Sequence, residues 1–375
     1  MTEFAQDTVK PNPGSRRIPL VLHWLPGAFL LSVVGVGAVL AVTSSGFREF
    51  PQDKDVIRGE WMAAYEKNFD TEVPWRQSAV GLWGTVGYRL FGEAREGAIV
   101  GQDGWLYTAE EFQTAPGDAA EIAAKVGYVK QVRDELAKDG VKLVVALVPA
   151  KARLYPEHLG TVKVPGVKAE VYEDFRQSLE AAGILAPDIF AAMRREKGRS
   201  GGALFLRTDT HWTPEGARVT AQTLARTVRG LHLDLPPATF ETTAAAPIAR
   251  KGDLLRYLPV PEGTGPDPDR VTAPTTERTD EGGGGLLGDE TIAVTLVGTS
   301  YSADTRENVW NFSGALAQAL GSEVLNVARE GQGPVTPMRE YLEGQDRQNN
   351  PPQVVVWEIP ERFLRVAYPQ KRITP

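Results

Sequence analysis

The chain has 375 residues, of which 42% are hydrophobic and 24% are charged. This is the composition of an ordinary globular protein, and it excludes a largely disordered or collagen-like chain. Lys and Arg number 41 against 48 Asp and Glu, so the net charge is −7. An acidic chain without a basic run lacks the electrostatic footprint of nucleic-acid-binding proteins. The chain contains no cysteine, which excludes disulfides, thiol nucleophiles and cysteine metal sites.

The first feature along the chain is an apolar segment near the N-terminus. Residues 20–42 contain no Asp, Glu, Lys or Arg, and as a helix they would span roughly 35 Å, enough for a bilayer core of about 30 Å. Lys10, Arg16 and Arg17 precede this segment. The positive-inside rule therefore predicts a cytoplasmic leader over residues 1–17, a transmembrane anchor over 18–43 and an extracytoplasmic remainder.

A cleaved signal peptide is the alternative interpretation of the same segment. The apolar region of a signal peptide is normally about 7–15 residues long, which is shorter than residues 20–42. Ala41-Val42-Thr43 is also a poor cleavage site. We therefore favour a single-pass anchor in the inner (cytoplasmic) membrane, with the rest of the chain in the periplasm.

The remaining chain predicts a helical appendage followed by an α/β domain. Residues 44–95 have the amphipathic pattern of helices and form the predicted linker or appendage. From residue 96 onward, helical periodicity alternates with continuous apolar runs, which are typical of parallel strands covered on both faces. The predicted strands are 142–148, 204–206, 292–297 and 354–357, and the predicted helices are 118–138, 169–182, 214–231 and 302–320.

This alternation predicts a three-layer α/β domain over residues 96–375 with a mainly parallel sheet. One segment breaks the pattern. Residues 261–290 are rich in Pro, Gly, Thr and acidic residues, and they predict a long flexible loop.

His211 is the strongest catalytic candidate among the four histidines. Thr213 is a good N-cap and Pro214 a good first helical residue, so Asp209 and His211 are predicted to stand on the last extended residues before a helix. Alternate residues of an extended chain project to the same side. Asp209 can then accept the Nδ1 proton of His211 and leave Nε2 free as a base. The alternative is a capped turn with a surface aspartate and a packed histidine.

A candidate nucleophile follows the strand predicted over residues 292–297, which leads directly into Gly298-Thr299-Ser300-Tyr301-Ser302. A serine between the carboxyl end of a strand and a helix is where open α/β sheets place their active sites. The N–H groups of the helix would favour a developing oxyanion. Such turns also cap helices without any catalysis. Together with the Asp209–His211 pair, however, the pattern favours catalysis in which a serine attacks and a histidine moves the proton.

With these motifs in view, the sequence resembles a known family, the periplasmic alginate O-acetyltransferases of the AlgJ/AlgX type, which have an SGNH-hydrolase-like domain. The resemblance covers most of residues 55–368. Beyond the two motifs above, it rests on Gly101-Gln102-Asp103-Gly104-Trp105-Leu106-Tyr107, Glu110-Glu111-Phe112, Tyr155-Pro156-Glu157, Asn326-Val327-Ala328, Gly331-Gln332-Gly333 and Trp357-Glu358-Ile359-Pro360-Glu361-Arg362.

The resemblance implies a catalytic triad of Ser300, His211 and Asp209. It also implies a permuted SGNH topology, because the Asp/His pair precedes the serine in the chain. For the oxyanion hole we expect the Ser300 backbone N–H with help from Gly331 and Gly333, whose alternative role is to permit a backbone bend. The candidate sugar-facing aromatic residues are Tyr301, Trp212 and Trp310, with core packing the stronger interpretation for Trp310.

The function implied by the resemblance is that of a membrane-anchored extracytoplasmic O-acetyltransferase. It would move an acetyl group through a serine ester onto hydroxyls of an exported polysaccharide, alginate or a similar exopolysaccharide. A membrane-bound acyltransferase of the MBOAT type would deliver the acetyl group. Two alternatives stay open: a polysaccharide acetyl esterase with the same triad, and a non-catalytic carbohydrate-binding component of an export complex. We expect no cofactor, and no metal site either, because Asp-x-His lacks the further ligands that zinc usually has.

Overall fold

The structure is a computed structural model, and it describes residues 20–43, 50–72, 76–280, 292–305 and 308–365. The chain divides into two compact units, Met1–Trp83 and Gly84–Pro375. The predicted leader over residues 1–17 lies outside the described residues.

The first unit contains the apolar segment. It forms the helix α1 (Leu20–Thr43), and within the described part of the chain Trp24–Thr43 is the one stretch long and apolar enough to cross a membrane. The helix α3 (Glu60–Glu72) follows, and its Trp61 and Tyr65 rings stack at 5.3 Å between centroids. Helix α4 (Arg76–Val86) runs across the division between Trp83 and Gly84, and η1 (Gly87–Phe91) belongs to the second unit. The prediction of helices within residues 44–95 is therefore confirmed.

The second unit is built on a four-stranded sheet. Its strands are β3 (Lys142–Val148), β8 (Val294–Val297), β9 (Val324–Asn326) and β10 (Val354–Pro360). They stand in the order β3-β10-β8-β9, and each neighbouring pair is parallel. The predicted parallel sheet is thus confirmed. The strand predicted over residues 204–206 does not join it, because Phe205 instead forms an isolated bridge with Trp212.

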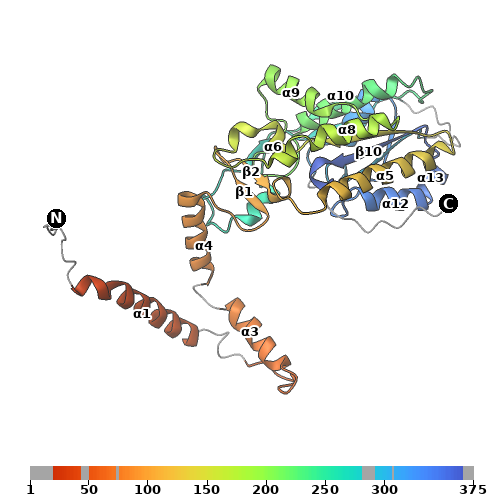
Figure 1. Cartoon of the computed structure of the whole chain (residues 1–375). Helices are drawn as coiled ribbons and strands as arrows, with labels where there is room; N and C mark the ends of the chain where they lie inside the picture. Colours follow the sequence, from red (N-terminus) through yellow and green to blue (C-terminus); the bar gives the residue numbers. More distant parts are fainter. Residues whose placement is uncertain (1–19, 44–49, 73–75, 281–291, 306–307, 366–375) are drawn as a thin grey trace, which may run out of the picture. The chain divides into compact units, whose positions relative to one another are not determined.

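Helices cover both faces of this sheet, which confirms the three-layer prediction (Figure 1). Alternate side chains of β3 point to opposite faces, as the two-residue period of a strand requires. Val144, Ala146 and Val148 pack in the same apolar cluster as α9 (Ile189–Ser200), α10 (Pro214–Arg229) and α11 (Phe312–Leu320). The other face packs against α5 (Asp118–Ala137), α8 (Val171–Ala181) and α12 (Val335–Glu343).

Short elements surround these layers. Three antiparallel ladders pair β1 (Ala98–Val100) with β2 (Leu106–Thr108), β4 (Phe240–Ala244) with β7 (Pro274–Arg278), and β5 (Ile248–Arg250) with β6 (Asp269–Val271). The short helices are α6 (Lys151–Leu154), α7 (Gly166–Ala169), α13 (Asp346–Asn349) and the 3₁₀ turns Ala109–Glu111, Pro156–His158, Asp253–Tyr257 and Glu361–Phe363.

Two predictions about this region are wrong. The first is the loop over residues 261–290, because β6 and β7 lie inside it and pair with β5 and β4; residues 281–290 lie outside the described residues. The second is the helix predicted to begin at Ser302. Helix α11 begins only at Phe312, because the Asn308 side chain donates to the carbonyl oxygens of Ser300 and Ala303 and supports a turn instead.

Candidate active site

Three side chains from distant parts of the sequence meet beyond the carboxyl end of β8. Asp209 Oδ1 lies 2.7 Å from His211 Nδ1, and His211 Nε2 lies 2.7 Å from Ser300 Oγ. Asp209 and His211 are buried, whereas Ser300 is partly exposed. The structure therefore places the three predicted residues in one continuous hydrogen-bonded chain that ends at an accessible hydroxyl.

A tight hairpin between α9 and α10 positions the histidine. The Leu206 N–H donates to the His211 carbonyl at 3.0 Å, and the Thr213 N–H donates to the Leu204 carbonyl at 2.9 Å. Thr213 then caps α10, since its hydroxyl accepts from the Gly216 N–H. The predicted N-cap and helix start are confirmed here. The predicted extended segment is wrong, because residues 207–211 form a bend in which the Asp209 side chain accepts from the His211 backbone N–H, and this bend fixes the direction of the imidazole.

Asp209 orients the imidazole of His211, and both of its carboxylate oxygens accept hydrogen bonds. Oδ1 also accepts from the His211 backbone N–H at 2.9 Å, and Oδ2 accepts from Arg250 Nη2 at 3.3 Å and from the Asp253 N–H at 3.2 Å. Burial raises the pKa of this carboxyl, but the hydrogen bonds and charge of His211, together with Arg250, outweigh that cost and hold the pKa well below its usual value. Asp209 is therefore an anion that favours the proton on Nδ1 and leaves Nε2 to face the serine.

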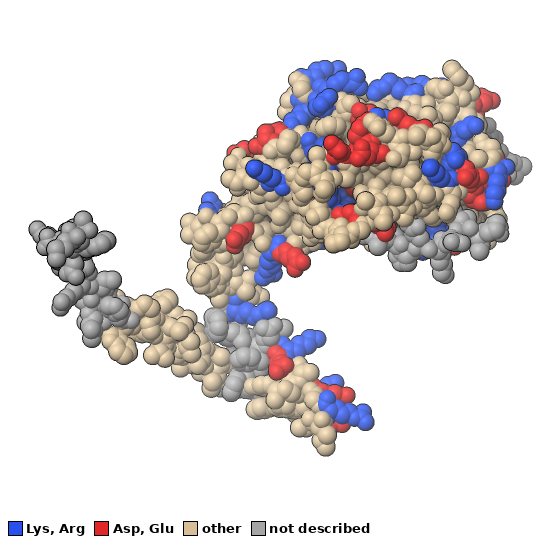
Figure 2. Space-filling model, viewed as in Figure 1, with Lys and Arg blue, Asp and Glu red and all other residues tan. Residues whose placement is uncertain are grey.

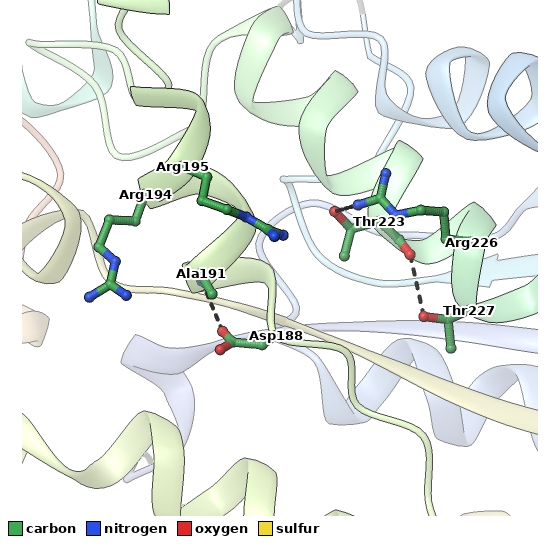
Figure 3. Close-up of a pocket in the computed structure, with 7 residues that line it drawn as sticks. All are labelled: Asp188, Ala191, Arg194, Arg195, Thr223, Arg226 and Thr227. Carbon is green, nitrogen blue, oxygen red and sulfur yellow. Dashed lines mark hydrogen bonds between the residues drawn. The ribbon is translucent and has the colours of Figure 1, made fainter. Parts of the chain in front are cut away.

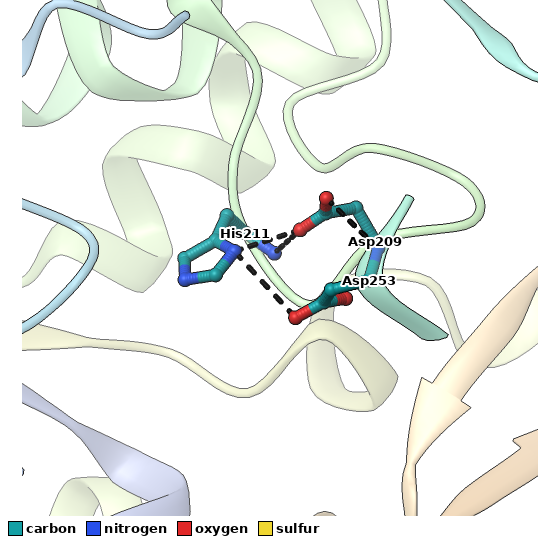
Figure 4. Close-up of side chains that lie close together, drawn as sticks. All are labelled: Asp209, His211 and Asp253. Carbon is teal, nitrogen blue, oxygen red and sulfur yellow. Dashed lines mark hydrogen bonds and ion pairs between the residues drawn. The ribbon is translucent and has the colours of Figure 1, made fainter. Parts of the chain in front are cut away.

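The same place contains the one cluster of possible metal ligands found among the described residues. Oxygen and nitrogen atoms of Asp209, His211 and Asp253 lie within 4.8 Å of one another (Figure 4). The carboxylates and Nδ1 already make hydrogen bonds, Asp253 with the N–H and hydroxyl of Thr210. The Arg250 cation also lies against Asp209. This donor set fits a hydrogen-bonded triad better than a cation site, since a metal ion would have to displace those contacts.

Two aromatic rings fix the orientation of the imidazole. Trp310 stacks on His211 with 4.6 Å between centroids and 17° between planes. Tyr301 lies against the ring at 4.7 Å, and its hydroxyl donates to the Thr210 carbonyl at 2.7 Å. This last bond joins the serine turn directly to the histidine hairpin, so the two halves of the site are held in register.

The turn that carries Ser300 is organised by a buried carboxyl group in β10. Glu358 accepts from the Thr299 N–H at 2.7 Å, from the Thr299 hydroxyl at 3.0 Å and from the Ser302 hydroxyl at 3.1 Å. Burial raises the pKa of Glu358 to about 7, although the bonds from Thr299 oppose the rise. Gly298 begins the turn because a Cβ there would lie 2.6 Å from Glu358 Oε2.

The oxyanion prediction has a mixed outcome. The Ser300 N–H has no acceptor within the part of the chain that the structure describes, so it is available to an oxyanion. The expected helix N-terminus behind it is absent, because α11 begins at Phe312. Gly331 and Gly333 have φ values of +75° and +64°, which fits their alternative role in a backbone bend. No contact among the described residues joins them to Ser300, and their help in the oxyanion hole stays a prediction.

The prediction of sugar-facing aromatic residues is wrong for Trp212 and Tyr301. Trp212 is 0% exposed and packs edge-on against Tyr301 at 5.0 Å, while Tyr301 is 2% exposed. Both rings are held in the core by the hairpin and the serine turn, so neither reaches solvent. Trp310 is buried as well, in agreement with the stronger interpretation of that residue.

Four residues of the site have no role assigned to them in the sequence analysis: Arg250, Asp253, Glu358 and Lys151. Arg250 and Asp253 stand about 40 residues after Asp209 with no local motif to join them. Glu358 left a signal, a carboxyl group inside an otherwise apolar strand. The fully buried Lys151 ammonium group donates to the carbonyl oxygens of Leu106, Arg207 and Asp209 at 2.5, 2.9 and 3.0 Å. Burial lowers the pKa of Lys151 to about 8, against the opposing charge of Glu111.

Comparison with known proteins agrees with this geometry. Residues 98–361 match the family described as SGNH hydrolase-like domain, acetyltransferase AlgX. The chain is 41% identical over 345 residues to a probable alginate O-acetylase AlgJ of Pseudomonas fluorescens, covering 91% of this chain and 86% of that protein. It is 42% identical over 328 residues to the probable alginate O-acetylase AlgJ of Pseudomonas aeruginosa, covering 84% and 82%.

Among solved structures, the O-acetyltransferase domain of Pseudomonas putida AlgJ is similar with a TM-score of 0.65 and 41% identity, over 72% of this chain and 93% of that one. The matched family region includes the histidine hairpin, the serine turn and the buried carboxyl of β10. The chain belongs to the AlgJ/AlgX family of alginate O-acetylases and carries its SGNH-hydrolase-like acetyltransferase domain.

Proposed function

We propose that this chain acetylates hydroxyl groups of an exported polysaccharide, alginate or a polymer like it, with Ser300 as nucleophile, His211 as base and acid, and Asp209 as the residue that orients the imidazole. The observation that carries the proposal is the unbroken series of hydrogen bonds from Asp209 through both nitrogens of His211 to Ser300 Oγ. The names of the relatives, alginate O-acetylases, support the choice of acceptor.

The reaction proceeds in two balanced halves. Ser300 Oγ attacks the acetyl carbonyl carbon while its proton passes to His211 Nε2, and the donor leaves with that proton. A sugar hydroxyl then gives its proton to Nε2 and attacks the serine ester, and Ser300 Oγ leaves and recovers the proton. The charge that develops on the carbonyl oxygen in each half faces the free Ser300 N–H. The Asp209 carboxylate stabilises the imidazolium in both halves.

The setting of this reaction follows from the N-terminal helix. We propose that α1 is an uncleaved anchor in the inner membrane, with the second unit in the periplasm, because the positive residues of the leader precede it. Acetyl-CoA is not expected in that compartment. A membrane-bound acyltransferase of the MBOAT type would therefore supply the acetyl group, and the polysaccharide would be the acceptor.

The test uses the full chain in detergent micelles with a small acetyl ester as donor and unacetylated alginate oligosaccharides as acceptor. The parent is expected to yield acetylated oligosaccharide, and Ser300→Ala none. Ser178→Ala, an exposed serine on α8, is the matched control and is expected to behave as the parent. Release of free acetate without acetylated sugar would assign the triad to an esterase. Acetylation that persists in Ser300→Ala overturns the proposal.

A further inference from the structure

A second surface of the molecule has a charge opposite to that of the whole chain. The chain carries a net charge of −7, yet Lys and Arg side chains gather along the upper edge of the molecule, over α9 and α10 (Figure 2). A groove of about 450 Å³ between these two helices is lined by Arg194, Arg195 and Arg226 with a single carboxylate, Asp188. This groove is separate from the residues that surround Ser300.

The charges of this groove are available to a ligand. Asp188 is already engaged as the N-cap of α9, because its Oδ1 accepts from the Ala191 N–H at 2.9 Å. Within the described residues, Arg195 and Arg226 have no ion-pair partner. In Figure 3 the Arg195 side chain extends from α9 toward α10, whereas Arg194 points to the other side of its helix. Arg195 and Arg226 are therefore two exposed cations on facing helices, and neither forms an ion pair with a carboxylate of the described residues.

One of these cations is also held in place. Arg226 Nη2 donates to the hydroxyl of Thr223 at 3.0 Å, and that hydroxyl in turn donates to the Val219 carbonyl at 2.8 Å. Thr223 is only 7% exposed, so it is a fixed support rather than a mobile surface group. A guanidinium group that is oriented before binding loses less entropy when it pairs with a carboxylate.

The arginines of α10 continue the basic surface along the helix. Arg218, Arg226 and Arg229 stand on one face, since steps of three or four residues return to the same side of an α-helix. They line a second groove, of about 490 Å³, between α10 and α11, and no acidic residue lines it. Arg218 pairs with Glu215, and Arg229 donates to the Ala319 carbonyl. This α10 arginine row thus joins the two grooves through Arg226.

The row also leads toward the serine. Thr213, the N-cap of α10, follows His211 by two residues, and Arg229 stands at the other end of the helix, about 24 Å away at 1.5 Å per residue. A flexible polymer with repeated negative charges could contact the row along this length while one of its sugar units reached Ser300. Arginine forks match carboxylates in a bidentate fashion, which suits the uronate groups of such a polymer.

We propose that the groove between α9 and α10, extended by the α10 arginine row, is a binding surface for a polyuronate chain, outside the site of acetyl transfer. This inference rests on the proposed function for the identity of the polymer, but it concerns binding and not chemistry. The surface holds the carboxylates of sugar units remote from the unit that is being acetylated. It therefore contributes to affinity for long acceptors and not to the reactivity of Ser300.

The experiment measures binding of unacetylated alginate oligosaccharides, long enough to span α10, to the full chain in non-ionic detergent micelles. Arg195→Gln/Arg226→Gln is expected to bind about five- to tenfold more weakly than the parent. Arg195→Lys/Arg226→Lys, which keeps the charge and loses the fork, is expected to fall between the two. Lys130→Gln/Lys138→Gln removes two exposed cations on the other face of the sheet, Lys130 in α5 and Lys138 directly after it, and is expected to bind as the parent does.

Further measurements separate this proposal from the proposed function and from a membrane role. The affinity of Ser300→Ala is expected to equal that of the parent, whatever that variant does to acetyl transfer. Hydrolysis of a small acetyl ester is expected to be unchanged in Arg195→Gln/Arg226→Gln, which also shows that this variant is folded. Equal binding by the Gln variant and the parent overturns the proposal. So does equal binding of a neutral glucan oligosaccharide, or a loss in the variant of binding to phosphatidylglycerol vesicles alone.

Discussion

Glu358 lies directly beneath the nucleophile turn, with its Oε2 2.7 Å from the backbone nitrogen of Thr299, the residue before Ser300. The carboxyl group is 0% exposed and comes from β10, the strand next to β8 in the sheet. From the sequence we expected a helix N-terminus to order this turn. In the structure the Glu358 carboxyl group orders it instead. A single buried side chain ties the serine to the centre of the sheet.

The ionisation of Glu358 should make the fold less stable as the pH rises. Its pKa is raised to about 7 by burial from an ordinary value of 4.5, so the folded chain holds a proton that the unfolded chain releases between these values. The contribution of this proton to the free energy of unfolding is complete below about pH 4.5 and is lost as the pH rises through 7. It amounts to about 3 kcal/mol at most.

The variant Glu358→Gln should remove this part of the pH dependence. Its amide oxygen, in the place of Oε2, can accept from the Thr299 N–H and the Ser302 hydroxyl, and the Thr299 hydroxyl can rotate to accept from the NH₂ group in the place of Oε1. The measurement is urea unfolding of the full chain in micelles at pH 5 and pH 8, for the parent, for Glu358→Gln and for the exposed control Glu343→Gln. If the free energy of unfolding changes by the same amount between pH 5 and pH 8 in all three proteins, Glu358 is not the source of this pH dependence.

Gly298 should tolerate no side chain. A Cβ at this position would lie 2.6 Å from Glu358 Oε2 and 2.9 Å from Ser302 Oγ, so Gly298→Ala must displace the turn. We expect a loss of stability of about 1–3 kcal/mol together with a marked fall in kcat for acetyl transfer.

The control for this substitution is Gly127→Ala in α5, where an added Cβ meets nothing within 4 Å. There the change should stabilise the helix by about 0.5–1 kcal/mol. Thermal unfolding and acetyl transfer measured side by side compare the two variants. A Gly298→Ala protein as active and as stable as Gly127→Ala would show that the close approach of Glu358 is not required.

The sequence predicted the parts of this molecule that depend on local pattern. The continuous apolar run of residues 142–148 matches β3 at both ends, and the Thr213 cap fixes the start of α10 as expected. The catalytic candidates were found because Asp209 and His211 are two residues apart and Ser300 directly follows a recognisable strand. That these two motifs lie together in space followed only from the resemblance to a family, because no local pattern shows it.

What could not be predicted depends on contacts between distant segments. The Thr-rich strand β7 has no apolar periodicity of its own and becomes a strand only through its pairing with β4. Arg250 and Asp253 join the site because their segment folds back onto Asp209. The Asn308 side chain donates to two carbonyl oxygens of the serine turn, and α11 therefore begins later in the chain than helix propensity predicts.

Asp209 and Asp253 both face His211, and they should differ sharply in importance. Asp209 Oδ1 lies 2.7 Å from Nδ1, whereas Asp253 Oδ2 lies 3.9 Å from it. Asp209→Asn should lower kcat by about 10³- to 10⁴-fold, because an amide favours the wrong tautomer of the imidazole. Asp253→Asn should have a much smaller effect, since its main bonds go to Thr210. Steady-state kinetics with a small acetyl ester compare them, and equal losses would assign the orienting role to the pair.

Lys151 should be as important for the position of Asp209 as the residues that contact the Asp209 carboxylate. Its ammonium group is buried and satisfies three backbone carbonyls, including that of Asp209 itself, and it lies 5.2 Å from the centre of the Trp105 ring. Lys151→Met keeps much of the side-chain volume but leaves these carbonyls without a donor. We expect a loss of about 3–5 kcal/mol in the free energy of unfolding.

The functional consequence of Lys151→Met should follow from displacement of the triad. In the fraction that still folds, kcat should fall while KM for a small ester changes little, because the ammonium group does not touch substrate. Lys130→Met, at an exposed position of α5, is the matched control. Its free energy of unfolding should stay within about 0.5 kcal/mol of the parent's, and its kcat within about twofold. If the two variants unfold at the same urea concentration, Lys151 is not the support that its three carbonyl contacts indicate.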